Sequence, residues 1–416
     1  MLTSTCLAAF ALALPPASPV QTTWTVATDG SGDFLQIQQA IDVAADGDVV
    51  AVKAGTYAPF LAEKRLTIVG PEFTGFVPTA QVNGASAVRN TDGFTLAGLV
   101  LGSLVLSDIG GTVTIDECRL TAASLAGVNQ PTLDAVRVDG LLLSRTTVNG
   151  PSGNFGFNPV NAAGWAARVR DSALVVEGST LVGGAGNDPF DCDGASSAGG
   201  TALELRFADA SIVGSVLRGG NGGVVCCLCA CSFDEADGIP LRTLGSRVQF
   251  LGGVKLEQSP GDSGLGSLVD ATDTELIWST SNPPSDVVLK GASSFTATSG
   301  GVWLTIPGSD TPGQTRSVRV EAPAGALGLL VLGSAAAPGV LTGFAPDLWI
   351  SSGAPFFLVP IVGTGVSSPV LDVTLPTAPS LVGTHFQRQA VFPTVASPLD
   401  GSSGSLSNPA PLLLRF

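Results

Sequence analysis

The sequence is poor in charge and in several side-chain types that carry out catalysis. Only 13% of its 416 residues are charged, with 19 Lys and Arg against 34 Asp and Glu, and it has a single histidine and a single tyrosine. The net charge of −15 repels a phosphate backbone, so we expect no nucleic-acid partner. A polyanionic sugar polymer is also a poorer match than a neutral glycan or another protein.

Long apolar runs are missing after the N-terminus, so we expect no membrane span. The first twenty residues differ, because an apolar stretch from Leu7 to Leu14 is followed by small residues and prolines. This pattern is typical of a secretory signal peptide, although no Lys or Arg precedes it. We therefore predict a removed signal over residues 1–20 and a secreted, extracellular or cell-surface protein, expected to be a monomer.

Six of the seven cysteines lie after the predicted signal, and five of them are clustered. The clustered cysteines are Cys192, Cys226, Cys227, Cys229 and Cys231. An exported chain favours disulfides among them, with a soft metal ion as the alternative, and the pairing cannot be deduced from the sequence. Cys118 stands apart and is expected to stay outside these disulfides.

Glycine and proline are abundant, at 53 and 28 residues, and 44% of the chain is hydrophobic. Such a composition indicates many short strands joined by tight turns around a large core. The stretch "VATDGSGDFLQIQQAIDVAADGDVVAVKAGTY", residues 26–57, combines a strand, a turn, an amphipathic helix and further strands. We predict Asp33 as the N-cap of this helix and Gly47 at its end. Its apolar stripe comprises Phe34, Ile37, Ala40, Ile41 and Ala44.

This opening resembles the start of the catalytic domain in pectin methylesterases, and more widely the pectin lyase-like right-handed parallel β-helix superfamily. The likeness covers residues 23–70 and implies a short helix that caps the end of the β-helix. The family's catalytic motifs, a Gln-Asp pair, an Asp-Phe-Ile-Phe-Gly strand and a Leu-Gly-Arg-Pro-Trp strand, have no counterpart in this chain. The resemblance therefore implies the fold and no catalytic residue.

A short phrase then recurs, in which an apolar residue is followed by a polar residue and often by one or two glycines. Its apolar positions are Leu120, Val148, Leu181, Leu217 and Phe250, at spacings of 28, 33, 36 and 33 residues. Stacked repeats of this length would form one continuous core, with these side chains pointing inward. The prediction is an all-β chain with a right-handed parallel β-helix over residues 23–307.

From residue 313 the rhythm changes to alternating strands separated by Pro and Gly, which predicts an antiparallel β-sandwich over residues 313–416. The run "PTAPSLVGTHFQRQAVF" and the ending "LSNPAPLLLRF" resemble a C-terminal module of secreted bacterial proteins. The only histidine, His385, lies in this module. A lone histidine there is expected to be structural, which leaves no acid–base pair of the polygalacturonase kind.

Three groups of residues remain as site candidates. Asp188, Asp191 and Asp193 supply hard oxygen atoms within one loop and could hold Ca²⁺, or the loop is simply solvated. Trp165 and Trp278 are candidates for stacking on sugar rings, or they pack in the core. The arginines that recur near the repeats are expected to face solvent; these are Arg119, Arg145, Arg218 and Arg247.

These observations favour a non-catalytic β-helix protein with a structural, adhesive or glycan-binding role. A polysaccharide or a surface protein is the expected partner, and no cofactor is required. The alternative is a polysaccharide lyase or hydrolase with a non-standard active site.

Overall fold

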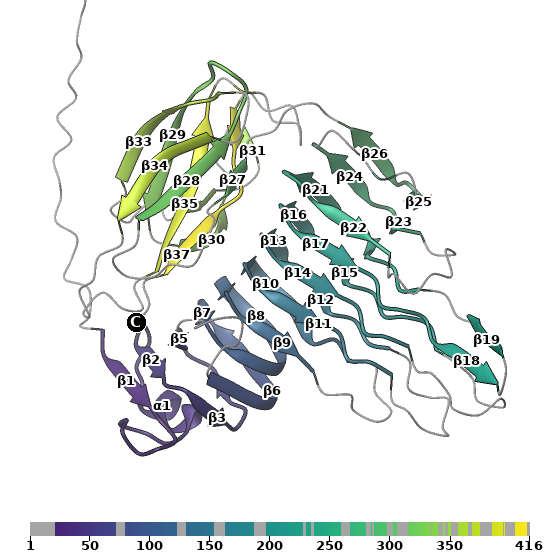
Figure 1. Cartoon of the computed structure of the whole chain (residues 1–416). Coiled ribbons are helices and arrows are strands. Elements are labelled where there is room, and N and C mark those ends of the chain that lie inside the picture. The colour runs from purple at the N-terminus through teal and green to yellow at the C-terminus, as the bar shows by residue number, and fades with distance from the viewer. Residues whose placement is uncertain are drawn as a thin grey trace, which may run out of the picture.

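The computed structural model describes residues 21–71, 80–122, 130–153, 163–186, 197–227, 230–233, 237–258, 267–279, 284, 287–297, 303–305, 315–333, 335–339, 344–345, 348–350, 357–364, 368–374, 385–393, 395 and 404–413. These residues are mostly in strands (Figure 1). Within them one helix occurs, α1 (Ile37–Val43), and no helix is long and apolar enough to cross a bilayer.

Most strands up to residue 297 pair in parallel and form three stacks, which the chain visits in a fixed order, coil after coil. The first stack contains β1 (Thr23–Val26), β2 (Val49–Val52), β5 (Thr67–Val69), β7 (Phe94–Ala97), the ends of β8 (Val100–Asp116) and β10 (Leu133–Ser144), β13 (Ala173–Glu177), β16 (Asp209–Val213), β21 (Arg247–Leu251), β24 (Glu275–Trp278) and β26 (Ser294–Ala297). The second stack contains β3 (Gly55–Tyr57), the starts of β6 (Ala80–Thr91) and β8, β9 (Arg119–Thr121), β11 (Thr147–Asn149), β14 (Thr180–Val182), β17 (Val216–Arg218) and β22 (Lys255–Glu257). The third stack contains β4 (Leu61–Ala62), the middle parts of β6 and β8, the start of β10, β12 (Ala167–Arg170), β15 (Leu203–Arg206), β20 (Leu241–Leu244), β23 (Val269–Thr272) and β25 (Val287–Lys290). The result is a parallel β-helix-like coil.

The predicted inward column is confirmed over four of its five members. Leu120, Val148, Leu181 and Leu217 are Cα partners in succession on β9, β11, β14 and β17, and all are wholly buried. The next member is Leu256 and not Phe250, which stacks between Ile212 and Trp278 in the first stack.

Phe250 was wrongly assigned because glycines follow the apolar residue in two different places. One is the corner between the first and second stacks, and the other is the loop that leaves the second stack. Gly252, after Phe250, occupies a sharp corner at φ 45° between the first and second stacks. Gly183 and Gly184 instead begin the long loop that leaves the second stack. The corner column holds residues at positive φ in six successive coils: Gly98, Glu117, Arg145, Gly178, Gly214 and Gly252.

The loops between the second and third stacks are joined by a ladder of glycine backbones. Successive hydrogen bonds run from the Gly184 amide to the Gly164 carbonyl oxygen, from Gly200 to Gly184, from Gly220 to Gly200 and from Gly238 to Gly220, at 2.7 to 3.0 Å. A Cβ at any of these positions would meet backbone atoms of a neighbouring loop. The glycines are required here by close packing of backbones.

Helix α1 covers the first coil. Ile37, Ala40 and Ile41 belong to the same buried cluster as the inward side chains of the coil, which confirms the apolar stripe. The predicted boundaries are wrong: Gln36 is the N-cap, and the helix ends at Val43, before Gly47. Asp33 does not cap the helix, because its carboxylate accepts a hydrogen bond from the Thr25 amide at 2.8 Å.

The C-terminal part of the chain is antiparallel and forms a separate module of β27–β37. One sheet holds β27 (Trp303–Thr305), β28 (Thr315–Glu321) and β34 (Ser368–Thr374); a larger one holds β29 (Leu327–Gly333), β31 (Phe344–Ala345), β33 (Phe357–Val362), β35 (His385–Phe392), β36 (Gly404–Leu406) and β37 (Ala410–Leu413); a third holds β30 (Ala335–Gly339) and β32 (Leu348–Ile350). Because β27 pairs with β28, the change to antiparallel pairing falls between Ala297 and Trp303, before the predicted start at residue 313.

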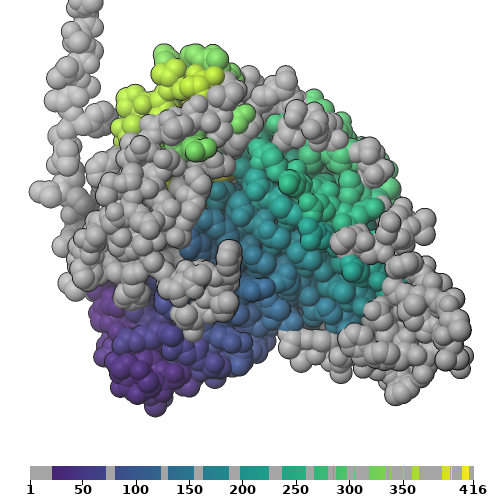
Figure 2. Space-filling model, viewed as in Figure 1, coloured from purple at the N-terminus to yellow at the C-terminus, as the bar shows by residue number. Residues whose placement is uncertain are grey.

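The module lies against the outer face of the first stack. Strand β30 contacts β8 and β10. In Figure 2 the yellow-green atoms of the module lie at the top of the view, above the atoms of the coil. Outward-facing side chains of the first stack are therefore buried, among them Leu142 and Val175, which form a small apolar cluster. This covered face also carries polar residues.

Candidate functional site

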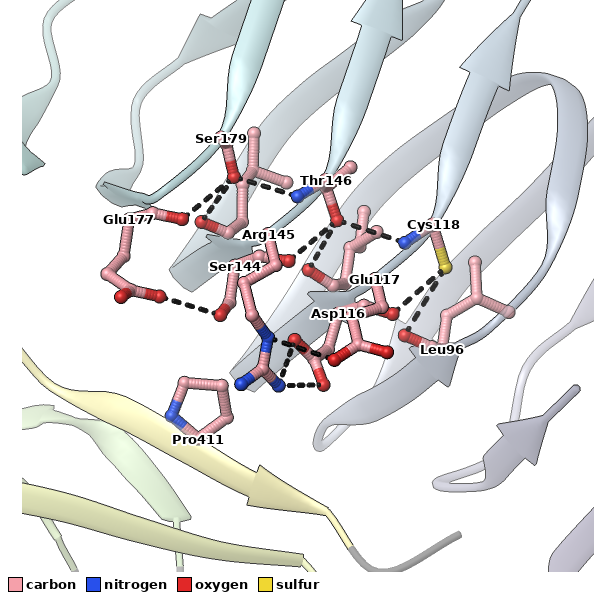
Figure 3. Close-up of polar contacts among 12 residues, drawn as sticks. Leu96, Asp116, Glu117, Cys118, Ser144, Arg145, Thr146, Glu177, Ser179 and Pro411 are labelled. Carbon is pink, nitrogen blue, oxygen red and sulfur yellow. Dashed lines mark hydrogen bonds and ion pairs between the residues drawn. The ribbon is translucent and has the colours of Figure 1, made fainter. Parts of the chain in front are cut away.

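Three polar side chains stack on the covered face of the first stack. Asp116 on β8, Ser144 on β10 and Glu177 on β13 occupy the same register position on adjacent strands (Figure 3). Adjacent strands lie about 4.8 Å apart, so these groups are within reach of one another. Asp116 and Ser144 are inaccessible to solvent, and Glu177 is 4% exposed.

Arg145 forms ion pairs with two acids at this cluster, Asp116 and Glu117. It sits in the corner after β10 at φ 48°, and its Nη2 lies 2.8 and 2.7 Å from the two carboxylate oxygens of Asp116. Its Nε is 3.2 Å from Oε1 of Glu117. Charge-assisted contacts of this kind are strong when buried. The expectation that Arg145 faces solvent is therefore wrong, since its side chain is 13% exposed.

Glu177 is a buried acid of the cluster whose pKa is raised. Burial raises the pKa of its carboxyl, while the charge of Arg145 and the hydrogen bond from Ser144 oppose that change. The Ser144 hydroxyl donates to Oε2 of Glu177 at 2.8 Å. The raised pKa favours a neutral carboxylic acid, the form that a general acid requires.

The module closes this cluster from the other side. Arg388 on β35 is wholly buried, donates to the carbonyl oxygen of Pro411 at 2.5 Å, and its charge acts on Glu177. Pro411 of β37 lies beside the cluster in Figure 3. The cluster thus has acid–base side chains but offers a polymer no access in this state, and its charges act between the coil and the module.

A row of hydroxyl groups holds the corner next to the cluster. The amide of Cys118 donates to Oγ1 of Thr146 at 3.3 Å, and the amide of Thr146 donates to Oγ of Ser179 at 3.0 Å (Figure 3). The amide of Ser179 donates to Oγ of Ser215 at 3.1 Å. Each buried corner amide is thereby paired with the next coil. The Cys118 thiol lies 3.4 Å from the Asp116 carbonyl oxygen, so it packs within this row.

The outer face of the third stack carries a second polar arrangement. Its register aligns residues of alternating charge on five neighbouring strands: Asp134, Arg168, Glu204, Arg242 and Asp270. Arg168 donates to both oxygens of Asp134 at 3.1 and 2.7 Å, and this contact, with the Asp134 charge, raises the pKa of Arg168. The Arg168 guanidinium lies 5.2 Å from the centre of the Trp165 ring.

The predicted site residues have different outcomes. Trp165 is half-buried at the edge of the third stack, whereas Trp278 is 2% exposed and stacks on Phe250 at 4.4 Å inside the coil. Trp278 therefore has no free face for a sugar. Asp188, Asp191 and Asp193 lie outside the described residues, and no group of three metal-ligating side chains occurs within the described ones.

The cysteine cluster is described only in part. Cys192 and Cys229 lie outside the described residues. Cys226 and Cys227 belong to β18 (Val224–Cys227), which pairs with β19 (Ala230–Phe233) in an antiparallel hairpin, and the backbone register sets Cys226 opposite Cys231. Their oxidation state stays a prediction.

The buried cluster was missed in the sequence, although a signal for it exists. Asp116, Ser144 and Glu177 each follow the inward apolar residue of the first stack, namely Ile115, Leu143 and Val176. Aligning the repeats on these apolar residues places the three polar ones in one column. The next coil has Val213 at this position, so the polar column is confined to three strands.

Comparison with known proteins identifies no family for this chain. No family model matches the chain, and no curated protein matches it. Among solved structures, the chain is similar to a pectin methylesterase from carrot, at 13% identity and a TM-score of 0.24, over 68% of this chain and 85% of that one.

Proposed function

We propose that the protein is exported and non-catalytic, a right-handed parallel β-helix capped by α1 and followed by a C-terminal β-sandwich, with a structural, adhesive or glycan-binding role. The observation that carries this proposal is the closed state of the Asp116–Arg145–Glu177 cluster. Among the residues that the structure describes, this cluster is the arrangement most like a pair of catalytic acids, and it is buried beneath the module. An acid–base catalyst must reach the atoms it protonates.

The proposal is tested by incubating the pure protein with a panel of neutral and acidic polysaccharides. Binding is measured on the immobilised polymers, and cleavage is followed as new reducing ends or unsaturated sugar ends. We expect binding to at least one polymer without release of ends. Steady release of ends that scales with protein concentration would refute the non-catalytic role.

The second candidate, a lyase or hydrolase with a non-standard site, is favoured by one observation. Asp116 and Glu177 lie on nearly adjacent strands with Arg145 between them, a set of groups able to donate a proton and stabilise negative charge. If cleavage is found, Asp116→Asn and Glu177→Gln should each abolish it, and Glu63→Gln, in an exposed ion pair with Arg89, should leave it unchanged. Activity that survives both cluster variants would assign catalysis elsewhere.

Calcium and disulfides belong to the same proposal. A Ca²⁺ ion held by Asp188, Asp191 and Asp193 should raise the melting temperature when calcium is added, and Asp191→Asn should remove that effect. Alkylation without a reductant, followed by mass spectrometry, should label few of the clustered cysteines. Extensive labelling together with stoichiometric zinc would favour a metal site instead.

A further inference from the structure

Strands β29 and β33 form one side of the C-terminal module, away from the coil (Figure 1). They pair in antiparallel register, so each outward residue of one strand lies opposite an outward residue of the other. The outward residues, here called the apolar face, are Leu327, Leu329, Val331, Leu358, Pro360 and Val362. None of these six side chains carries a polar group.

The opposite side of the same two strands fills the core of the module. Leu330 and Ile361 are buried in its apolar cluster, and Leu332 and Val359 pack against that cluster. Successive side chains of a strand point to opposite sides of the sheet, so the apolar face points away from this core. Both sides of β29 and β33 are therefore apolar.

The apolar face is open to solvent in the single chain. The exposed fractions are 65% for Leu327, 36% for Leu329, 50% for Leu358 and 54% for Val362. These four residues expose roughly 400 Å² of apolar surface, a size that often marks an interaction site on a monomer.

Strand β28, in the smaller sheet of the module, has the pattern expected for a strand with one side in water. Its Val318 and Val320 are buried, whereas Arg319 between them is exposed. Strands that are apolar on both sides are normally covered on both sides. The sequences of β29 and β33 thus fit a sheet that a further layer covers.

The edge of the sheet beside the apolar face does not favour the addition of a strand. Within the part of the chain that the structure describes, β33 ends its sheet and pairs with β29 alone. Pro360 of β33 has no amide hydrogen, and a proline on an edge strand hinders pairing with another strand. The covering layer is therefore expected to pack on the face and not to extend the edge.

A second copy of the apolar face has the size and chemistry to be this layer. Two such faces with their rims would bury about 1,000 Å² in total, which is the lower limit for a specific interface. The face carries no charge, so two copies meet there without burying any of the acids that give the chain its net charge of −15. A uniformly apolar sheet is complementary to itself under a twofold rotation, and two sheets pack face to face about 10 Å apart.

We propose that two copies of this chain form a closed dimer through the apolar faces of their C-terminal modules. This inference is independent of the proposed function, and it replaces the expectation of a monomer. Each copy uses the same surface, so the dimer leaves no apolar face free for a third copy. The dimer would carry two coils, and a ligand with repeated sites would be held by both at once.

Sedimentation equilibrium of the full chain over a range of concentrations tests the dimer. We expect a reversible monomer–dimer equilibrium with a dissociation constant on the order of 10–100 µM, because interfaces near the lower size limit are weak. Added salt should favour the dimer, since it screens the repulsion between two acidic chains and leaves the apolar contact in place.

The double variant Leu327→Gln/Val362→Thr tests the location of the contact. These residues are Cα partners and are more than half exposed, so the variant should melt within a few degrees of the wild type. Its dissociation constant should rise at least tenfold, because four apolar side chains leave the dimer contact. The matched control Leu35→Gln/Val105→Thr changes residues of the coil region that are 49 and 41% exposed, and it should shift the constant less than twofold.

A chain that stays monomeric at all concentrations would overturn the proposal, as would a dimer that the double variant leaves intact. Assemblies that grow beyond two copies would also overturn it, because a closed contact stops at a dimer. Binding of a monomeric chain to zwitterionic lipid vesicles, lost in the double variant, would assign the apolar face to a lipid surface instead. None of these outcomes bears on the glycan assay, so the two proposals fail separately.

Discussion

Replacing Gly150 with alanine tests whether the glycine ladder holds the loops of the coil. A Cβ at residue 150 would lie 2.5 Å from the Gly164 carbonyl oxygen, 2.6 Å from the Gly184 amide nitrogen and 3.0 Å from the Ala166 amide nitrogen. The first two atoms are partners in a hydrogen bond of 3.0 Å. The new methyl group would therefore have to part these two backbone segments.

The cost follows from these contacts. Moving two packed backbones apart costs about 1–3 kcal/mol as overpacking, and weakening their hydrogen bond adds about 1 kcal/mol, so we expect a loss of roughly 2–4 kcal/mol of unfolding free energy. No flexible side chain is available to move aside, since all three atoms belong to the backbone.

Urea unfolding followed by circular dichroism measures this loss as a lower midpoint. The matched control is Gly110→Ala on β8, where the added Cβ would meet only a side-chain oxygen of Asp92 at 3.4 Å, an ordinary contact. We expect Gly110→Ala to unfold within ~0.5 kcal/mol of the wild type. If Gly150→Ala is as stable as Gly110→Ala, the ladder is not a packing requirement and the reasoning fails.

Three further substitutions probe the core, the buried cluster and the cap. Leu181→Ala should cost about 2–5 kcal/mol, because this wholly buried side chain stacks between Val148 and Leu217; a loss below ~1 kcal/mol in urea unfolding would contradict the column. The pKa of Glu177 is raised in the folded protein, so its contribution to stability is complete below the unfolded value of 4.5 and is lost as pH rises through the folded pKa. Glu177→Gln should flatten this decline in stability across unfolding curves measured at a series of pH values. A slope of stability against pH identical to that of the wild type would exclude the effect. Ile37→Asp should lower the melting temperature by placing a charge in the buried face of α1, and a normal melt with lost glycan binding would instead make this stretch a site.

The cap and the coil could be predicted because their signals are local and repeated. The apolar stripe of α1 and the strand Val49–Val52 were both identified from periodicity. The start of the helix was missed because Asp33 bonds to Thr25, a partner that only the folded chain brings near. The position of Phe250 was predicted wrongly because glycines follow the apolar residue both at the corners between stacks and at the start of the long loops.

The buried cluster could not be predicted in the same way. Arg145 lies in a corner that would be exposed on an isolated coil, and Glu177 follows an ordinary alternation of apolar residues. Both are buried because the C-terminal module packs against them, and Arg388 of that module, more than two hundred residues later in the chain, acts on Glu177. Local patterns carry no information on a contact of that separation.

The seating of the module on three consecutive coils has a consequence for how this protein can change in evolution. Coiled repeats usually gain or lose whole turns by duplication and deletion, because each repeat contacts only its neighbours. Here Asp116, Ser144 and Glu177 lie on successive strands beneath the same module, so an extra turn among them would separate charges that now meet. Val213 and Leu251 continue the column without charge from β16 onward. Turns of the coil after β16 are therefore not constrained by these charged contacts. Length variation among homologues should therefore concentrate between residue 214 and the end of the coil.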